Sequence, residues 1–298
     1  MRKVIITGGT GLVGKRLSEL LKQHGYKVNI LCRNPKKTDE YKWNVEEGYM
    51  DESAFEGTEI IVHLAGAGVA DHRWTDSRKK EIIDSRVAST RLLFKYLSKK
   101  THTIKSFISA SAVGYYGDRK NELLTEDDSA GTGFLAEVCR LWEQEADTIG
   151  TLNIPVSKIR IGIVLSKDGG ALPKLDFPVK FGIGAYIGNG KQYVPWIHID
   201  DLCNMFIHLI HHPEANGIYN ACAPDIKTNR EMSATIAQVL RRPFIPFPAP
   251  AFVIKTVMGE MATMLLMSNN CSSKKIIDTG FDFQYPTLNL ALENIYRK

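Results

Sequence analysis

The sequence predicts an α/β fold, a doubly wound parallel sheet with a smaller C-terminal substrate lobe. Three observations predict it. An apolar run over 3–7 leads into a glycine-rich turn, strand and helix patterns alternate as far as residue 165, and Gly- and Pro-rich loops with short segments follow. Alternating strands and helices are typical of a parallel sheet with helices on both faces. Loop-rich insertions are typical of a lobe that covers a substrate.

The first strand meets the first helix in the sequence Thr7-Gly8-Gly9-Thr10-Gly11-Leu12-Val13-Gly14. Glycines at 8, 11 and 14 allow positive φ in a tight turn and leave room for a pyrophosphate against the N–H groups of a helix N-terminus. Gly25 ends the helix and a second strand, 26–32, follows. This order predicts a Rossmann-type dinucleotide-binding domain. Its expected cofactor contacts here are Thr7, Gly8, Gly11, Leu12, Val13 and Gly14.

The residues after the second strand indicate which dinucleotide is bound. A carboxylate at this point usually accepts a hydrogen bond from the ribose 2′-OH of NAD. This chain has Arg33 and Asn34 instead, followed by Lys36 and Lys37. A guanidinium suits a 2′-phosphate, so the sequence favours NADP(H) over NAD(H). The alternative is that Arg33 is an ordinary solvated charge of the loop.

The later elements continue the same alternation. Apolar strands are expected at 59–64, 104–109 and 156–165, and helices at 76–100 and 135–149. Residues 1–165 are therefore expected to form the dinucleotide-binding domain, with 191–224 returning to it, and residues 166–190 and 225–298 a smaller, mostly helical lobe. Asp200 or Asp201 is expected to cap a helix that ends near His211, and Thr228 to Glu231 to open the next one.

Composition excludes several functional classes. The chain has 298 residues, is 44% hydrophobic and 24% charged, and carries a net charge of +5 without a dense basic tract. We therefore expect neither a nucleic-acid nor a membrane partner. Five scattered cysteines without a C-x-x-C pair indicate a reducing compartment, the cytoplasm, and no metal site. Met1 leads directly into the first strand, so no signal peptide is expected. The apolar stretch 250–267 is barely long enough to span a membrane, and the charged residues Lys255 and Glu260 interrupt it.

Several motifs together resemble an extended short-chain dehydrogenase/reductase of the NAD-dependent epimerase/dehydratase class. They are Thr7-Gly8-x-x-Gly11-x-x-Gly14, His63-Leu64-Ala65-Gly66, Ser109-Ala110-Ser111 with Tyr115-Tyr116-Gly117, and Trp196-Ile197-His198-Ile199-Asp200-Asp201. More narrowly, His72-Arg73-Trp74-Thr75, Arg160-x-Gly162 and the C-terminal Gly280-Phe281-x-Phe283 resemble its "epimerase family protein" subgroup. The resemblance adds Leu64, Ala65, Gly66, Ser109, Ala110 and Gly162 as expected cofactor contacts.

The chain departs from this class at the residues that move the proton. Active members carry a Tyr-x-x-x-Lys pair on the helix after the serine strand, where the tyrosine transfers the proton that accompanies hydride transfer. Here the corresponding helix reads Leu135-x-x-x-Cys139. Leucine has no proton to give, and an uncharged thiol does not stabilise a phenolate as an ammonium does.

Other residues are candidates to replace that pair. Ser111 matches the serine of the class, and Tyr115 or Tyr116 could supply the missing phenol, although all three are also compatible with a structural role. Cys139 is more often a small core residue than a nucleophile. Arg73, Trp74, Arg160 and His198 are the expected substrate contacts, and the alternatives are loop packing for Arg73 with Trp74 and a helix cap for His198. His208, His211 and His212 are interpreted as a solvated helix end rather than metal ligands.

Three functions stay open on these observations. The first is an NADP-dependent oxidoreductase or nucleotide-sugar-epimerase-like enzyme that acts on a small polar substrate. The second is a protein that binds NADPH and senses it without turnover. The third is a regulatory protein, since members of this subgroup have carried a cell-division-inhibitor label, which comes from the resemblance alone. A homodimer is compatible with all three.

Overall fold

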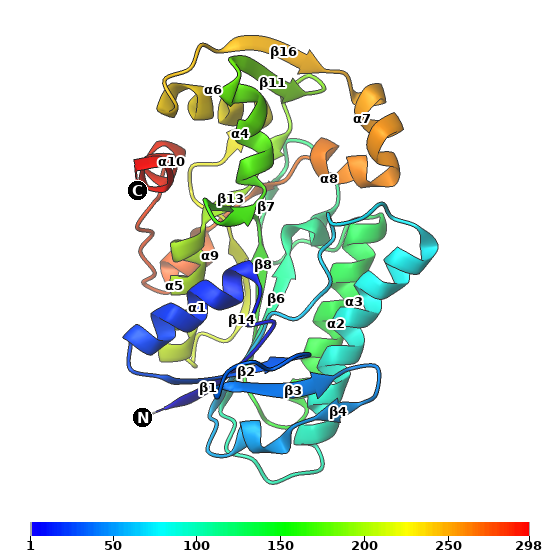
Figure 1. The fold of residues 1–298 in the computed structure, drawn as a ribbon, viewed down its shortest axis with the longest axis vertical. Coiled ribbons are helices and arrows are strands. Elements are labelled where there is room, and N and C mark those ends of the chain that lie inside the picture. Colours follow the sequence, from blue (N-terminus) through cyan, green and yellow to red (C-terminus); the bar gives the residue numbers. More distant parts are fainter. Residues whose placement is uncertain (1, 298) are drawn as a thin grey trace.

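The computed structural model describes residues 2–297, which form two lobes (Figure 1). The larger lobe holds an eight-stranded sheet in the order β14-β8-β6-β5-β1-β2-β3-β4. The strands are β1 (Lys3–Thr7), β2 (Lys27–Cys32), β3 (Glu40–Asn44), β4 (Tyr49–Met50), β5 (Ile60–His63), β6 (Ser106–Ala112), β8 (Val156–Ile161) and β14 (Gly217–Ala221). β4 pairs antiparallel with β3, and the other pairs are parallel. The strand order reverses between β1 and β5, where open α/β sheets bind their ligands.

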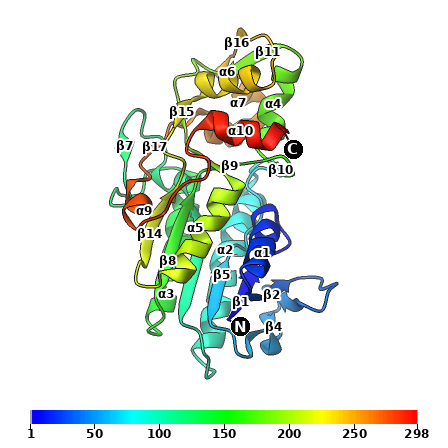
Figure 2. The same cartoon turned by 90° about the vertical axis from the view of Figure 1, so that its left-hand side faces the viewer.

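Helices cover both faces of this sheet (Figures 1 and 2). Helices α1 (Leu12–Gln23) and α5 (Ile199–His211) lie on one face, and α2 (Asp76–Leu97) and α3 (Phe134–Gly150) on the other. Successive residues of a strand point to opposite faces, so Val4 and Ile6 join the core under α1 and α5 while Ile5 joins the core under α2 and α3. This explains why the first strand reads as an unbroken apolar run.

The single strand predicted at 156–165 is wrong, because the chain leaves the sheet at Gly162. Strand β8 ends at Ile161, and β9 (Ile163–Ser166) joins β10 (Gly169–Gly170) and β13 (Trp196–His198) in a separate three-stranded sheet. A Cβ at Gly162 would lie 2.7 Å from the carbonyl oxygen of Pro195, so this crossing needs a glycine. The apolar alternation continues from β8 into β9, so the sequence pattern does not indicate the crossing. The strand of the large sheet therefore ends at Ile161 and not at residue 165.

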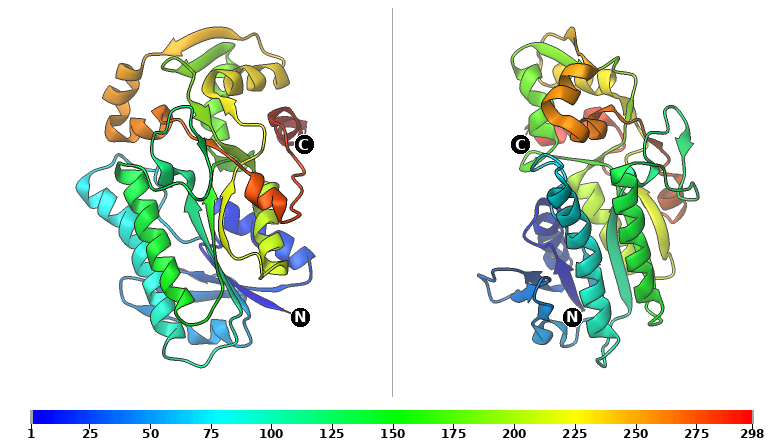
Figure 3. Two further views of the ribbon diagram at one scale, coloured as in Figure 1. Left: turned by 180° about the vertical axis from the view of Figure 1, so that it is seen from behind. Right: turned by 90° about the vertical axis from the view of Figure 1, so that its right-hand side faces the viewer.

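The smaller lobe lies above the carboxyl ends of the central strands (Figures 1 and 3). It contains α4 (Leu172–Lys180), α6 (Asn229–Val239), α7 (Ala251–Met258), α8 (Thr263–Leu266), α10 (Leu288–Arg297) and the parallel pair β11 (Ile183–Ile187) and β16 (Ile245–Ala249). Shorter elements complete the chain: β7 (Leu123–Leu124), β12 (Tyr193–Val194), β15 (Lys227–Thr228), β17 (Asn270–Cys271), α9 (Lys274–Asp278) and the 3₁₀ turns η1 (Glu52–Phe55), η2 (Val113–Tyr116) and η3 (Gly259–Ala262).

The helix caps agree with the sequence in one place and differ in another. Thr228 and Glu231 form the expected capping box at α6. At α5, however, the capping residue is His198, whose Nδ1 accepts a hydrogen bond from the N–H of Asp200 (3.1 Å), so the prediction of an aspartate cap is wrong. Asp200 is turned toward the Nε of Arg16 instead (2.6 Å), and Asp201 accepts two N–H groups of the 284–285 segment.

The apolar stretch 250–267 is not one continuous helix. It divides into α7, η3 and α8 at Gly259, which has a φ of 61°. Within residues 2–297, none of the helices combines the length and the apolar character that crossing a membrane requires. Exposed apolar side chains are frequent in this lobe, among them Phe177, Phe181 and Phe252.

Candidate functional site

The glycine-rich turn leaves the N-terminus of α1 open. Gly8 has a φ of 70°, and a Cβ there would lie 2.8 Å from the carbonyl oxygen of Leu64, while a Cβ at Gly14 would collide with the carbonyl oxygen of Gly8. The N-cap residue Gly11 provides no side-chain cap, and the first turn, which includes Leu12 and Val13, carries no acidic residue. The N–H groups of this turn are therefore available to an anion, and the turn fits a dinucleotide pyrophosphate.

Basic side chains follow β2. Arg33, Asn34, Lys36 and Lys37 are all exposed. Glu40, at the start of the neighbouring strand β3, accepts a hydrogen bond from the backbone N–H of Lys36 (2.6 Å), so its carboxylate is engaged by the loop. The end of β2 therefore presents cations where a 2′-phosphate would lie.

The side chain of Thr7 holds the backbone at the end of the neighbouring strand β5. The residue is fully buried. Its hydroxyl accepts the N–H groups of Leu64 and Ala65 (3.2 Å each) and lies 2.7 Å from Nδ1 of His63. Burial lowers the pKa of His63 to about 3, so this ring is neutral, and its Nε2 lies 3.0 Å from the hydroxyl of Thr90. Because Thr7 is buried, its expected role as a cofactor contact is corrected to a positioning role.

The residues that follow β5 are accessible at the switch point, where the strand order reverses between β1 and β5. Leu64 and Ala65 are half-buried and Gly66 is exposed. By contrast, Ser109 and Ala110 are buried inside β6, where the Ser109 hydroxyl donates to the carbonyl of Ala110 (2.9 Å). These two side chains are therefore not available to a cofactor, against the expectation from the sequence.

Ser111 belongs to a buried network centred on an ion pair. Its hydroxyl donates to Oε1 of Glu143 (2.7 Å). The guanidinium of Arg160 donates to both carboxylate oxygens of Glu143, from Nε and from Nη2 at 2.9 Å each. Both charged side chains are almost fully buried. Arg160 is thus held by the protein, and the expectation that it contacts a substrate is wrong.

The two neighbouring tyrosines have different surroundings. Tyr116 is fully buried, and its hydroxyl accepts from Nη1 of Arg160 (2.9 Å) and lies 2.7 Å from Oδ1 of Asn220. Burial raises the pKa of Tyr116 further above its ordinary value. Tyr115 is half-buried, its ring centroid lies 3.5 Å from Cζ of Arg160, and its hydroxyl makes no hydrogen bond within the described residues. Tyr116 is therefore a structural residue, and Tyr115 is the phenol that stays available.

Leu135 and Cys139 lie one turn apart on α3 and face η2. A Cβ at Gly114 would lie 3.2 Å from Cβ of Leu135 and 3.9 Å from Sγ of Cys139. Cys139 is buried, and burial together with the charge of Glu143 raises the pKa of its thiol to about 11. The thiol stays protonated at neutral pH, so Cys139 is a core residue and not a nucleophile.

The loop after Gly66 joins the two lobes. The guanidinium of Arg73 donates to the carbonyl of Val257 in α7. Trp74 donates from Nε1 to the carbonyl of Val69 (2.8 Å), and its ring packs edge-on against Phe134 (4.8 Å between centroids). These contacts show the loop-packing role that was the alternative for both residues. A substrate contact by Arg73, which is exposed, stays a prediction.

The histidines do not form a ligand site. His198 is buried, caps α5 and stacks against Tyr285 (4.0 Å between centroids), so the expected substrate contact is wrong. At the end of α5, His208 lies 2.9 Å from the hydroxyl of Thr279, and His212 lies 3.0 Å from Glu214. Within residues 2–297, no cluster of His, Cys, Asp or Glu side chains has the arrangement of a metal site.

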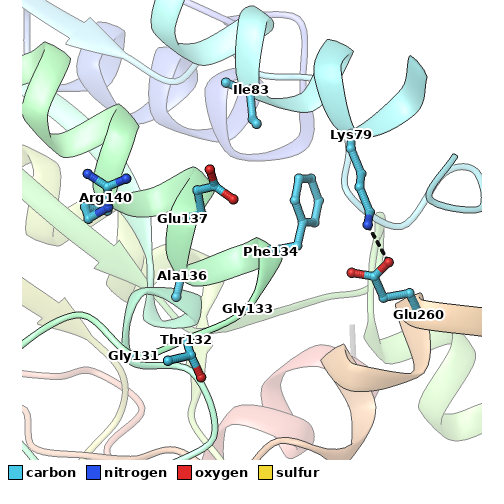
Figure 4. A pocket seen from close by; sticks show the side chains of 10 residues that line it. All are labelled: Lys79, Ile83, Gly131, Thr132, Gly133, Phe134, Ala136, Glu137, Arg140 and Glu260. Atoms are coloured by element: carbon cyan, nitrogen blue, oxygen red, sulfur yellow. Dashed lines mark hydrogen bonds and ion pairs between the residues drawn. The ribbon is translucent and has the colours of Figure 1, made fainter. Parts of the chain in front are cut away.

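A pocket of about 590 Å³ lies between α2 and the start of α3, where its lining residue Phe134 packs against Trp74 (Figure 4). Ile83, Phe134 and Glu137 point toward it, and the ion pair between Lys79 and Glu260 closes one side. Glu260 comes from η3 of the smaller lobe, so the pocket spans both lobes. None of the residues predicted from the motifs lines it.

Two important side chains were not found by the motifs. Glu143 belongs to none of the motifs above, and its partnership with Ser111 and Arg160 depends on three elements, α3, β6 and β8, that are separate in the sequence. Arg86 of α2 was not singled out, yet its guanidinium lies directly beside Gly66. A basic residue on a helix is ordinarily solvated, so nothing in the sequence around Arg86 indicated that its guanidinium lies beside Gly66.

Comparisons with known proteins agree with this geometry. Residues 4–135 match the NAD dependent epimerase/dehydratase family, and residues 249–295 match a domain of unknown function, DUF1731. An epimerase family protein of Staphylococcus saprophyticus is 35% identical over 301 residues, covering 99% of both chains. One from Mycobacterium leprae is 33% identical over 291 residues, covering 97% of this chain and 94% of the relative.

Solved structures share the whole fold. The human epimerase family protein SDR39U1 (isoform 2), described with NADPH, has a TM-score of 0.89 and 30% identity and covers 99% of both chains. A nucleoside-diphosphate sugar epimerase from Corynebacterium glutamicum has a TM-score of 0.82 and 32% identity, and the match covers 99% of this chain and 58% of that one. A dTDP-glucose 4,6-dehydratase from Bacillus anthracis, in complex with NAD, shares the fold with a TM-score of 0.75 and 16% identity, covering 100% of this chain and 96% of that one.

Proposed function

This chain belongs to the epimerase family proteins, and we propose that it binds NADP(H) and acts as an oxidoreductase or nucleotide-sugar-epimerase-like enzyme on a small polar substrate. The observation that carries the proposal is the open N-terminus of α1 behind a turn in which Gly8 and Gly14 have no room for a side chain. Such a turn is suited to a pyrophosphate.

The preference for NADP(H) rests on the loop after β2. Arg33 is exposed there, and the one carboxylate at the start of β3, Glu40, is engaged by the backbone of Lys36. A guanidinium matches the charged oxygens of a phosphate and binds them more strongly than a neutral ribose hydroxyl. The human relative whose structure is described with NADPH supports this choice.

The chemistry needs a proton donor as well as a hydride carrier. Bound NADP(H) supplies the hydride, and the chain supplies the proton. We assign that role to Tyr115, because its hydroxyl is not engaged within the described residues and Arg160 lies over its ring at 3.5 Å. The hydroxyl of Ser111 donates a hydrogen bond to Glu143, so only its lone pairs are left for a ligand.

A second function is favoured by a specific observation, the pair Leu135 and Cys139. Since neither side chain moves a proton and Ser111 and Tyr116 are engaged in the buried network, a catalytically inactive protein that senses NADPH is also compatible with this site. Within this alternative falls the regulatory role of a cell-division-inhibitor type. Tight dinucleotide binding without turnover distinguishes it from the enzyme.

A calorimetric titration tests the cofactor assignment. NADPH, NADP⁺, NADH and NAD⁺ are titrated into the wild type, freed of co-purified nucleotide, and into Arg33→Ala. We expect Arg33→Ala to weaken NADPH at least about tenfold, equivalent to about 1.4 kcal/mol, and to leave NADH unchanged. Arg91→Ala, which removes an exposed guanidinium of α2, is the control. Equal affinities for NADPH and NADH in the wild type would contradict the NADP preference.

Turnover is tested with Tyr115→Phe in a screen of small polar carbonyl and nucleotide-sugar substrates. The enzyme proposal expects consumption of NADPH or epimerised product in the wild type and a loss of at least about a hundredfold in the variant, because general acid catalysis contributes that much. NADPH binding in the wild type with no turnover in the screen would favour the sensor.

A further inference from the structure

Arg86 is a cationic side chain in which one of the three guanidinium nitrogens makes all the recorded hydrogen bonds. It lies on α2 and is partly buried. Its Nη1 makes every hydrogen bond recorded for the guanidinium, to the carbonyls of Ala67 (3.1 Å) and Ile82 (2.9 Å) and to the hydroxyl of Ser85 (3.5 Å). Within residues 2–297, Nε and Nη2 have no hydrogen-bond partner, and no carboxylate pairs with the guanidinium.

The unused edge of Arg86 faces Gly66. A Cβ at Gly66 would lie 2.9 Å from Cζ, 3.1 Å from Nη2 and 3.2 Å from Nε of Arg86. The guanidinium also lies over the ring of Trp142, at 5.0 Å from the centroid. Gly66 is exposed and lies just beyond the carboxyl end of β5. The free donors are therefore at the surface of the sheet where a ligand would pass, and only glycine leaves them room.

The charge of Arg86 is not compensated by its neighbours. Burial lowers the pKa of the guanidinium, and the charge of Arg78 adds to this shift. A buried cation without a carboxylate is unfavourable unless a ligand provides the missing partner. Cys139 of α3 corresponds to the position at which active members of the class carry a cationic lysine. In this chain the positive charge near that position is that of Arg86, which belongs to α2.

The order of the strands says which part of a dinucleotide would meet Arg86. The pyrophosphate belongs at the turn after β1, and the phosphate-bearing ribose at Arg33 after β2. Because β2 and β5 lie on opposite sides of β1, the other nucleotide half extends over the end of β5. That half contains the nicotinamide ribose, whose hydroxyls accept hydrogen bonds. It also contains the nicotinamide ring, which is positively charged only in the oxidised form.

We propose that Arg86 binds the nicotinamide-ribose half of NADP(H) through Nε and Nη2 and that its charge makes the protein bind the reduced form more tightly than the oxidised form. This inference rests on the proposed function, since it requires a bound dinucleotide. It adds a preference between oxidation states that Arg33 cannot provide, because the 2′-phosphate is the same in both forms. Arg86 is a binding and positioning residue and takes no part in proton transfer.

Separate titrations with NADPH and NADP⁺ test the proposal on the wild type, Arg86→Met and Arg86→Lys. Arg91→Met, at an exposed position of the same helix, is the matched control. We expect the wild type to bind NADPH at least about tenfold more tightly than NADP⁺ and Arg86→Met to reduce this ratio to about twofold or less while weakening NADPH. Arg86→Lys keeps the charge and is expected to keep most of the ratio, and Arg91→Met to behave as the wild type.

The outcomes separate this inference from the function beneath it. A wild type that binds NADPH and NADP⁺ equally, or an Arg86→Met variant with an unchanged ratio, overturns the inference and leaves the cofactor assignment standing. A wild type that binds none of the dinucleotides overturns both. Circular dichroism melting checks the fold of each variant. Should Arg86→Met fail to fold, Arg86→Gln replaces it, because the amide keeps a donor for the carbonyl of Ala67 and removes the charge.

Discussion

At the scale of single residues, the ion pair between Glu143 and Arg160 sets the positions of the polar side chains at the end of β6. Glu143 accepts from Ser111, and Arg160 contacts Tyr116 and lies under the ring of Tyr115. Two buried charges are stable only as long as each keeps its partner. The catalytic candidates therefore share one support, and removal of either charge disturbs all of them.

Glu143→Gln tests this support. We expect a loss of about 3–5 kcal/mol in the free energy of unfolding, because the variant leaves the buried guanidinium of Arg160 without a charged partner. Urea denaturation measures it. Glu145→Gln is the control on the same helix, since it breaks the pair with exposed Arg91 and should cost about 1 kcal/mol or less. Similar losses in the two variants would show that the buried pair does not support the site.

His63 predicts a pH dependence of stability. Its pKa falls to about 3 in the folded chain, from an ordinary value of 6.5, because the ring is buried. The unfolded chain therefore binds a proton that the folded chain refuses between these values, so stability is present above pH 6.5 and is lost as the pH falls toward 3.

The measurement is the free energy of unfolding at a series of pH values. His63→Gln is expected to lose stability at pH 7 and to show a shallower decline between pH 6.5 and 3 than the wild type. His212→Gln, at the surface beside Glu214, is the control and should keep the wild-type slope. A slope that His63→Gln leaves unchanged would assign the acid sensitivity to other groups.

At the scale of elements, the turn from β1 to α1 depends on close contacts between backbone atoms. Gly14 lies in the first turn of α1, and a Cβ there would collide with the carbonyl oxygen of Gly8. We expect Gly14→Ala to weaken NADPH at least about tenfold, since the first turn must move away from the pyrophosphate position. Gly150→Ala is the control, because its nearest contact would be an ordinary 3.8 Å. Unchanged NADPH affinity in Gly14→Ala would contradict the assigned pyrophosphate site.

Local sequence predicted this turn well because its backbone shape depends on glycines that are close in the sequence, with Gly11 and Gly14 packed against Gly8. The same holds for the capping box of Thr228 and Glu231. The crossing at Gly162 escaped prediction because Ile161 and Ile163 continue one apolar alternation into two different sheets. The short strands β3 and β4 were missed as well, since each buries a single side chain, Trp43 and Met50, and shows no apolar run.

At the scale of the whole molecule, the site depends on which elements meet. The doubly wound sheet and its switch point follow from the order of strands and helices, which the sequence pattern already contained. The partners of Ser111, Arg160 and Arg86 do not follow from the sequence pattern, because a buried charge is recognised only once its surroundings are known. Arg160 and His198 were for this reason interpreted as substrate contacts although both are buried.

The two lobes are linked at the loop that follows Gly66. Arg73 reaches the carbonyl of Val257, and Lys79 pairs with Glu260. Both contacts join the large lobe to α7 and η3 of the smaller lobe. This linkage holds the smaller lobe against the large lobe beside the end of the sheet.

The central claim is that the turn after β1 holds NADP(H), and the most direct test is calorimetric titration of the nucleotide-free wild type with NADPH. The account predicts saturable binding of one NADPH per chain with a micromolar or lower dissociation constant, corresponding to about −8 kcal/mol or stronger. Absence of binding by NADPH, NADP⁺, NADH and NAD⁺ alike would contradict it and leave the fold without a nucleotide function.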